Sequence, residues 1–333
     1  MRILTWHVHG SWTTSFVAGR HDYLLPLTAD RDADGRGRAR TWTWPATAVE
    51  HTPQQLAEQV RAGGVDVVVL QRPHEIDLLE RWTGARAGRD LPAVYVEHNA
   101  PTGHAASTRH PMADVDVVAD GTVPLVHVTA FNALMWDNGT ARTVVIDHGI
   151  PDPGHLYTGE RSTVAAVVNE PVRRWRVAGT DVLLHMGREA ALDVYGMGVD
   201  GLRAHLDATG GLGSDATLHG DVPQHAMHAR LGQARVYLHP FRWTSLGLAL
   251  LEAMAVGLPV VALATTETPE AVPAAAGVVS NRPQDLVAAA HRWIADPDEA
   301  RARGDAARAH VLTRYPLAEF LLRWDTLLQE VTP

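Results

Sequence analysis

The chain has 333 residues, of which 46% are hydrophobic and 20% charged, so it is long enough for two ordinary domains that each bury a core. Its formal charge is −9 and every basic residue is an Arg, which argues against a nucleic acid or an acidic membrane as the main partner. The absence of Cys excludes disulfide and thiol chemistry. No signal segment opens the chain and no apolar run reaches the roughly 18 residues of a membrane helix. We therefore expect a cytoplasmic protein without a transmembrane segment.

The first half of the chain alternates short apolar segments with helical or loop segments. One of these, residues 53–62, is amphipathic, as expected for a helix that covers one face of a sheet. The alternation predicts an α/β fold with a doubly wound parallel sheet. The expected strands are Arg2–Trp6, Val65–Leu70, Ala93–Glu97, Leu125–Val128 and Thr143–Ile146.

Polar residues follow each of these expected strands. Ligands of such sheets bind outside the carboxyl ends of the strands, so the polar residues predict a cleft there. They are His7, His9, Gly10, Gln71, Arg72, His98, Asn99, Thr129, Asn132, Asp147 and His148.

Within this predicted cleft, His7 and His9 alternate along a strand and so face the same side. They could form a metal pair or bind the hydroxyl groups of a ligand in the cleft. Because no third ligand follows at a telling spacing, we expect no metal site. Trp12, Trp42 and Trp44 offer either flat faces for a sugar ring or an aromatic acceptor, or anchors for a long loop.

The most polar stretch, residues 30–40, carries Asp30, Asp32 and Asp34 among Arg and Gly residues. An Asp-x-Asp pair can hold a divalent metal on a nucleotide diphosphate. In a charged, Gly-rich setting, the pattern instead favours a solvated and mobile lid.

The turn composition of residues 151–160 marks a change of domain. We predict an N-terminal domain over residues 1–153, a second α/β domain over 154–312 and a C-terminal helix over 313–333. The strands expected in the second domain are Val164–Val168, Leu192–Tyr195, Ala216–Leu218, Val236–Leu238, Val260–Ala264 and Gly277–Val279.

Arg173, Arg174 and Arg176 follow the first of these strands, in the sequence NEPVRRWRVAG. Guanidinium groups grip phosphate oxygens in pairs, and three of them at the carboxyl end of a strand favour phosphate binding. The alternative is a solvated, Arg-rich turn.

Residues 239–270 predict a loop, an apolar helix, a turn, a buried strand and a polar loop. The free N–H groups expected at the helix N-terminus, on Ser245, Leu246 and Gly247, form an anion site suited to a diphosphate. Glu252 lies seven residues further along, roughly 10 Å away at 1.5 Å per residue, a distance that suits a ribose hung from the diphosphate. His225 and His228, on a short helix ahead of this stretch, are expected at the surface.

This stretch resembles the signature of the retaining GT-B glycosyltransferases of the GT4 type, the glycosyl transferases group 1. That signature runs roughly Pro-Ser-x-x-Glu-Gly-Phe-Gly-Leu-x-x-Leu-Glu-Ala-Met-Ala-x-Gly-x-Pro-Val-Val. The matching residues are Pro240, Gly247, Leu248, Leu251, Glu252, Ala253, Met254, Ala255, Gly257, Pro259, Val260 and Val261.

The resemblance implies a GT-B fold of two Rossmann-like domains, with the C-terminal helix crossing back to the N-domain. It implies that Glu252 binds ribose, that His98 contacts the donor sugar near the reacting carbon, and that Arg173 stabilises the leaving diphosphate. The family's first Glu, which binds hydroxyls of the donor sugar, falls at Thr244. Its Lys falls at Ala178, and we expect Arg174 or Arg176 to supply that cation.

We therefore expect a metal-independent, hexosyltransferase-like enzyme with no cofactor, whose partners are a nucleotide-diphosphate sugar and a small-molecule or glycan acceptor. Residues 244–248 would hold the nucleotide, and His7, His9, Gly10 and Trp12 would line the acceptor side. Two alternatives remain. A nucleotide-sugar 2-epimerase would share the fold, and a non-catalytic nucleotide-sugar binder is suggested by Thr244 and Ala178.

Overall fold

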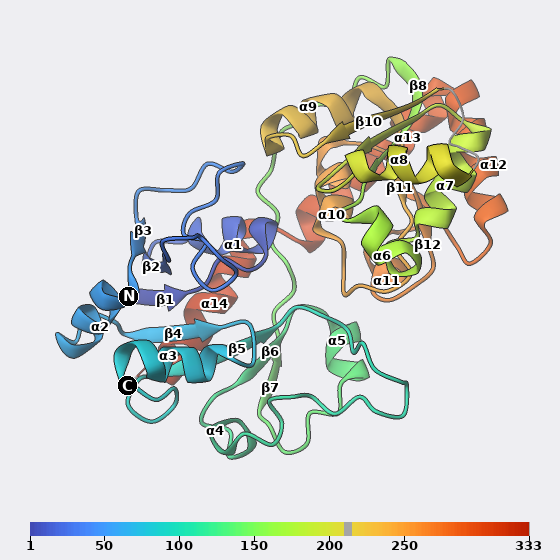
Figure 1. Cartoon of the computed structure of the whole chain (residues 1–333). Coiled ribbons are helices and arrows are strands. Elements are labelled where there is room, and N and C mark those ends of the chain that lie inside the picture. Colours follow the sequence, from blue (N-terminus) through green and yellow to red (C-terminus); the bar gives the residue numbers. More distant parts are fainter. Residues whose placement is uncertain (210–214, 333) are drawn as a thin grey trace. The chain divides into compact units, whose positions relative to one another are not determined.

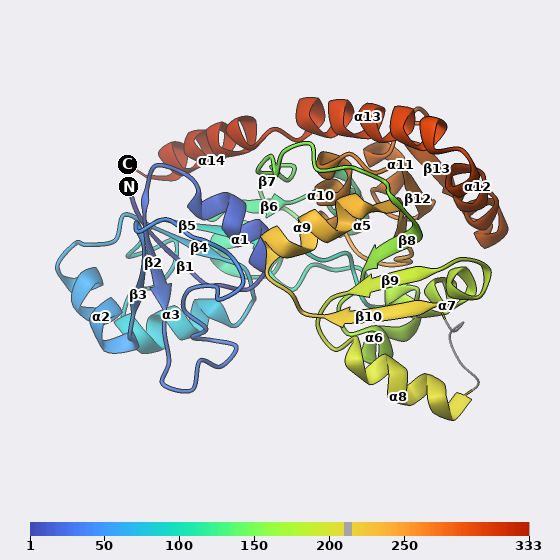
Figure 2. The ribbon, with the colours of Figure 1, turned by 90° about the horizontal axis from the view of Figure 1, so that it is seen from above.

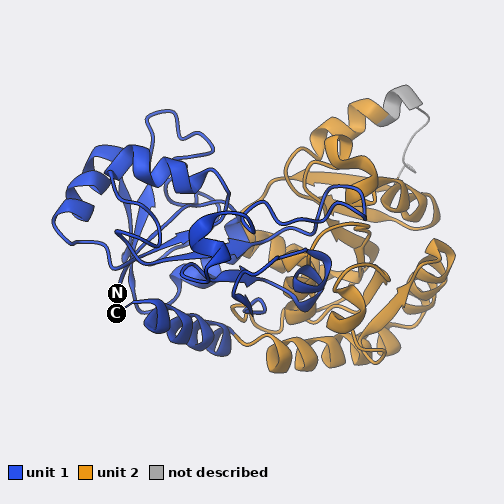
Figure 3. Cartoon of the chain, turned by 90° about the horizontal axis from the view of Figure 1, so that it is seen from below, with its two compact units in different colours: residues 1–149, 317–333 blue, residues 150–316 orange. Residues whose placement is uncertain are grey.

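The computed structural model describes residues 1–209 and 215–332. It divides into two compact units, each with its own sheet (Figure 3). Unit 1 comprises Met1–Gly149 and Leu317–Pro333, and unit 2 comprises Ile150–Pro316. The fold is thus α/β, with two Rossmann-like domains built on parallel sheets.

The sheet of unit 1 has the order β3-β2-β1-β4-β5-β6-β7, and all neighbouring strands are parallel (Figure 1). The five strands expected from the sequence are present, and two strands at one side of the sheet, the edge strand β3 and its neighbour β2, were missed. The missed strands, DYLLP and AVEH, are short and mix charged with apolar residues, so they lack the continuous apolar run of a central strand. The bounds are β1 Arg2–Thr5, β2 Asp22–Pro26, β3 Ala48–His51, β4 Val67–Leu70, β5 Ala93–Glu97, β6 Leu125–His127 and β7 Thr143–Val145.

Helices cover this sheet. The expected helix at residues 53–62 is α2, which begins with a capping box between Thr52 and Gln55. Leu56 of α2 and Leu78 of α3 pack with Leu4 and other residues of the strands in one core. The bounds are α1 Gly10–Val17, α2 Pro53–Arg61, α3 Glu75–Thr83, α4 Asp116–Ala119, α5 Ala130–Met135 and α14 Leu317–Val331.

The C-terminal helix α14 is part of unit 1. Its Trp324 contacts the rings of Trp12 and Phe16, with centroids 5.7 and 5.1 Å apart. Nε2 of His21 lies 2.8 Å from a carboxylate oxygen of Asp325. Buried aromatic rings and a partly buried polar contact therefore hold the end of the chain against its beginning.

The sheet of unit 2 has the order β10-β9-β8-β11-β12-β13 and is also parallel throughout. All six strands expected from the sequence are present, because each contains apolar or β-branched residues. β9, β11 and β12 are buried along their whole length, whereas the edge strands β10 and β13 are partly exposed. The bounds are β8 Arg161–Val167, β9 Leu192–Tyr195, β10 Ala216–Gly220, β11 Ala234–His239, β12 Val260–Leu263 and β13 Gly277–Ser280.

Two apolar cores lie on the two faces of this sheet. One contains residues of α7, α8 and α12, and the other contains residues of α9, α10 and α13 (Figure 2). No helix in residues 1–209 and 215–332 is long and apolar enough to span a bilayer. The bounds are α6 Pro171–Ala178, α7 Thr180–Glu189, α8 Asp200–Thr209, α9 Gln224–Gln233, α10 Leu248–Val256, α11 Thr268–Ala271, α12 Pro283–Ala295 and α13 Pro297–Arg314.

Candidate active site

Both units place the predicted site residues at the same topological position. In unit 1, the strands that follow β1 are added on one side of it up to β3, and from β4 on the other side. In unit 2 the same change of side occurs between β8 and β11. The loops that leave such strands at their carboxyl ends form the usual ligand crevice of an open α/β sheet. Residues 7–10 and 71–72 leave β1 and β4, and residues 168–179 and 240–247 leave β8 and β11.

The helix α10 begins later than the sequence predicts. Its first residue is Leu248 and its N-cap is Gly247, so Ser245 and Leu246 belong to the preceding loop. Leu250 N–H donates to Gly247 O at 2.9 Å, whereas the N–H groups of Leu248 and Ala249 have no acceptor within the helix. The anion site predicted at residues 245–247 therefore shifts to residues 247–249. Ser245 and Leu246 are only 2% and 5% exposed, so they lie beneath this site and support it.

Gly247 leaves space for a buried histidine. A Cβ at position 247 would lie 2.3 Å from Cε1 of His239, so the imidazole packs directly against the backbone at the start of α10. His239 is fully buried, and neither ring nitrogen has a hydrogen-bond partner among the described residues. Burial lowers the pKa of His239 to about 3. The ring is therefore neutral at physiological pH.

Glu252 is a buried carboxylate that two side chains of α9 hold in place. Its Oε1 accepts from Nε2 of Gln224 at 3.2 Å, and its Oε2 lies 3.1 Å from Nε2 of His228. The prediction that His228 is a surface residue is wrong, because it is 7% exposed, whereas His225 is exposed as predicted. The signal for this contact was the i, i+4 spacing of Gln224 and His228, which places both on one helix face.

The predicted Arg-rich loop is a short helix, α6, with a kink at Trp175. Glu170 precedes α6 in the left-handed conformation, with φ 55°. The Arg173 side chain is 71% exposed, and its Nε lies 3.5 Å from a carboxylate oxygen of Glu170. Arg173 is thus held only weakly and remains accessible to a ligand.

Arg176 and Arg242 share the carboxylate of Asp181. Arg176 Nη1 lies 2.6 Å from Oδ2, and Arg242 donates through Nη1 and Nη2 at 2.5 and 2.7 Å. Burial alone would raise the pKa of Asp181, but the hydrogen bonds and charge of Arg242 lower it. Arg174 lies over the ring of Phe241, with Cζ 5.6 Å from the centroid. Neither Arg242 nor Asp181 was predicted, although Arg242 lies two residues after Pro240 of the signature.

Gly179 brings the two loops of unit 2 together. It has a positive φ of 70°, and a Cβ there would lie 1.8 Å from the carbonyl oxygen of Pro240. No residue with a side chain fits this contact. The cations that follow β8 and the loop that follows β11 therefore lie side by side.

In unit 1, His98 follows β5 and is 8% exposed. Its Nε2 lies 2.9 Å from Oε1 of Gln71, and its ring contacts those of His9 and Trp12, with centroids 4.2 and 4.9 Å apart. Burial, aided by His9 and His148, holds the pKa of His98 well below its ordinary value. Burial also lowers the pKa of His148 to about 3.

The other predicted cleft residues of unit 1 serve mainly to shape this region. Trp12 is 1% exposed, so the prediction that it offers a face to a sugar is wrong, because the ring is enclosed by the aromatic core. Gly10 begins the helix α1 and packs against Trp42. Half-buried His7 bonds through Nδ1 to the carbonyl of Gly37 at 3.0 Å.

The charged loop at residues 30–40 is tied to the body of unit 1. Arg31 bonds both carboxylate oxygens of Glu50, at 2.9 and 3.2 Å. Asp34 accepts from His74 at 2.8 Å and lies 3.1 Å from Arg72. Among the residues that the structure describes, no group of three His, Cys, Asp or Glu side chains is placed to hold a metal ion. The sequence predicted a mobile lid and none of these contacts, which hold the loop in one path.

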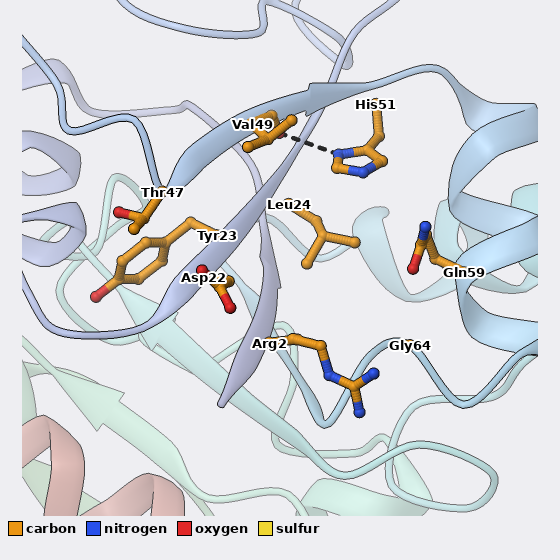
Figure 4. Close-up of a pocket in the computed structure, with 9 residues that line it drawn as sticks. All are labelled: Arg2, Asp22, Tyr23, Leu24, Thr47, Val49, His51, Gln59 and Gly64. Carbon is orange, nitrogen blue, oxygen red and sulfur yellow. Dashed lines mark hydrogen bonds between the residues drawn. The ribbon is translucent and has the colours of Figure 1, made fainter.

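Unit 1 also has a surface pocket of about 190 Å³, away from the predicted site residues (Figure 4). Side chains of β1, β2, β3 and α2 surround it, including Arg2, Asp22, His51 and Gln59. Arg2 is already paired with Asp66 at 2.6 Å. We assign this pocket no role in the site.

The two parallel-sheet, Rossmann-like units of this chain match the GT-B fold of known glycosyltransferase structures. Residues 177–296 match the family model Glycosyl transferases group 1, which is 120 of the 333 residues. At the level of sequence, no curated protein matches the chain.

Three solved structures illustrate the similarity. Anabaena Alr3699/HepE in complex with UDP has a TM-score of 0.73 and 16% identity, covering 99% of this chain and 100% of HepE. Sucrose-phosphate synthase (tll1590) from Thermosynechococcus elongatus has a TM-score of 0.70 and 15% identity, covering 99% and 98%. S. aureus TarM has a TM-score of 0.65 and 14% identity over 83% of this chain, which spans only 58% of TarM.

Proposed function

We propose that the protein is a retaining, GT4-type glycosyltransferase that moves a sugar from a nucleotide-diphosphate donor to a small-molecule or glycan acceptor. Unit 2 binds the nucleotide and unit 1 binds the acceptor. The observation that carries the proposal is the buried Glu252 carboxylate in α10. The N-terminus of α10 has no side-chain cap, and the loop before it packs at Pro240 against Gly179, directly after the arginines of α6.

The charges in unit 2 suit a diphosphate. Four guanidinium groups, of Arg173, Arg174, Arg176 and Arg242, accompany only the carboxylates of Glu170 and Asp181 in these loops. In a chain of net charge −9 this is a local excess of positive charge. Arg173 and Arg176 are both exposed, but Arg176 is paired with Asp181 at 2.6 Å, whereas Arg173 lies 3.5 Å from Glu170. Because Arg173 is the less firmly paired of the two, we assign it the stabilisation of the leaving diphosphate.

The proposed mechanism needs no metal and no cofactor. Fixed cations and backbone N–H groups stabilise the charge that develops on the leaving phosphate. The resemblance to retaining enzymes implies that the leaving phosphate oxygen takes the acceptor's proton while the new bond forms on the same face of the sugar. His98 contacts the donor sugar in this scheme.

The test is incubation with a panel of nucleotide sugars, with and without EDTA. The HepE structures hold UDP and UDP-glucose, which makes UDP-glucose the first donor to try. We expect slow donor hydrolysis without acceptor, unaffected by EDTA. A donor returned with an altered sugar would indicate an epimerase, and tight binding without turnover would indicate a non-catalytic binder.

A further inference from the structure

The side-chain amide of Gln71 has an orientation that its neighbours dictate. Its Nε2 lies 2.6 Å from the carbonyl oxygen of Trp6, which can only accept a hydrogen bond. The same nitrogen lies 3.2 Å from Oγ1 of Thr5, whose one proton is directed to the carbonyl of Val69. Both contacts require the NH₂ end of the amide. Oε1 of Gln71 is therefore the end that lies beside His98.

This orientation determines which nitrogen of His98 carries the proton. Nε2 of His98 lies 2.9 Å from Oε1 of Gln71, and an amide oxygen only accepts, so Nε2 must be protonated. Because burial keeps His98 neutral, its ring has one proton and Nδ1 keeps a lone pair. Since Nε2 makes the hydrogen bond to Gln71, Nδ1 is the ring nitrogen that can accept a proton from a ligand.

We propose that Gln71 is a positioning residue that fixes the Nε2–H tautomer of His98, so that His98 recognises the donor sugar through a hydroxyl that donates to Nδ1. This inference rests on the proposed function. It narrows the substrate class to sugars that present a proton donor to His98. A sugar with fluorine or a carboxylate in that place offers no proton and is discriminated against.

Buried carboxylates hold both partners of this pair. Gln71 N–H donates to Oε2 of Glu75 at 2.6 Å, and Glu75 is fully buried. On the other side, Glu97 accepts from the backbone N–H of Asn99 at 2.6 Å and lies 3.0 Å from Nε2 of His110. The turn that carries His98 and the strand end that carries Gln71 are thus both restrained. Such support is what keeps a recognition group in one geometry.

The tautomer can be read without any substrate, by NMR of protein with ¹⁵N-labelled histidines in which His98→Asn assigns the signals. We expect neutral His98 with Nε2–H, unchanged between about pH 8 and pH 6. In Gln71→Glu a carboxylate replaces the amide and favours the imidazolium, so His98 should titrate within that range. An Nδ1–H tautomer in the native protein, or a His98 spectrum that Gln71→Glu leaves unchanged, would overturn the proposal.

Turnover supplies the second readout, with donor analogues in which one sugar hydroxyl at a time is replaced by fluorine. At one position the native protein should use the analogue at least about a hundredfold less well than the donor. In Gln71→Glu, kcat/KM should fall as the pH is lowered through the pKa of His98, because the imidazolium cannot accept a proton from the sugar. Gln54→Glu, on the exposed side of α2, should show no such pH dependence. Equal use of every fluoro analogue would overturn recognition through Nδ1. If no nucleotide sugar is turned over, the proposed function fails, and the NMR experiment still decides the role of Gln71.

Discussion

Nε2 of His228 lies 3.1 Å from Oε2 of Glu252, and both side chains are buried in unit 2. Together with Gln224, this contact leaves the carboxylate with acceptor sites that a ribose can use. Gln224 and His228 hold the Glu252 carboxylate in one orientation, as a hydrogen-bond acceptor on an otherwise apolar helix. Without its two partners, the carboxylate would be costly to bury.

The first prediction concerns this acceptor. Glu252→Ala should lower nucleotide affinity about a hundredfold or more, since each charge-assisted hydrogen bond contributes about 1.5 to 3 kcal/mol. His228→Ala should weaken binding by a smaller factor, because the carboxylate remains but loses one anchor. Titration calorimetry measures both, with His225→Ala on the exposed face of α9 as the control. Unchanged affinity in Glu252→Ala would exclude a ribose-binding role.

The second prediction concerns the leaving group. Arg173→Ala should lower turnover by about 10² to 10³, the usual effect of removing one group that stabilises developing charge. Arg176→Ala should have less effect, because Arg242 continues to bind Asp181. EDTA should change little. A strong requirement for magnesium or manganese would contradict the metal-free mechanism.

The third prediction concerns Thr244, which stands where the GT4-type signature that this stretch resembles has its first Glu. A hydroxyl accepts fewer hydrogen bonds than a carboxylate, so the native protein should use a donor and its deoxy analogue at the contacted position almost equally. Thr244→Glu should discriminate between them. Strong discrimination by the native protein would point to Glu267, which is buried and whose N–H lies 3.4 Å from the carbonyl of Ser245. Glu270, which is exposed on α11, is the second carboxylate that could take this role.

The fourth prediction concerns pH and His239, whose pKa burial lowers to about 3. Below the ordinary pKa of 6.5, the unfolded chain binds a proton that the folded state excludes. Stability should therefore fall on acidification from about pH 6.5, by about 1.4 kcal/mol per pH unit for this group. His239→Leu should remove that contribution and raise stability at neutral pH, because two orphaned ring nitrogens disappear.

Urea unfolding of the native protein, His239→Leu and the exposed control His225→Leu, at pH 7 and pH 5, measures this effect. His239→Leu should lose less stability than the control on acidification, by about 2 kcal/mol. Equal losses in the two variants would show that His239 is not a neutral buried ring.

Much of the fold and part of the site could be predicted from the sequence alone. The central strands were predictable because continuous β-branched and apolar runs are needed wherever a parallel sheet is buried on both faces. Helix α10 was predictable from its apolar residues and from Gly257, which ends it in the left-handed conformation. The local sequence was sufficient to predict a strand or a helix end wherever the physical requirement involved only neighbouring residues.

Tertiary structure decided the partners, because contacts between residues distant in sequence have no local signature. The sequence allowed Trp12 to offer a flat face to a sugar or to anchor a loop, whereas the structure buries its ring in the core. His228 looked like a surface residue until the packing of α9 on α10 placed it against Glu252. Gln71 and His98 lie 27 residues apart, and only the pairing of β4 with β5 brings the amide to the imidazole. The protonation state of His98 is likewise a tertiary property, because it depends on burial and on which end of an amide faces the ring.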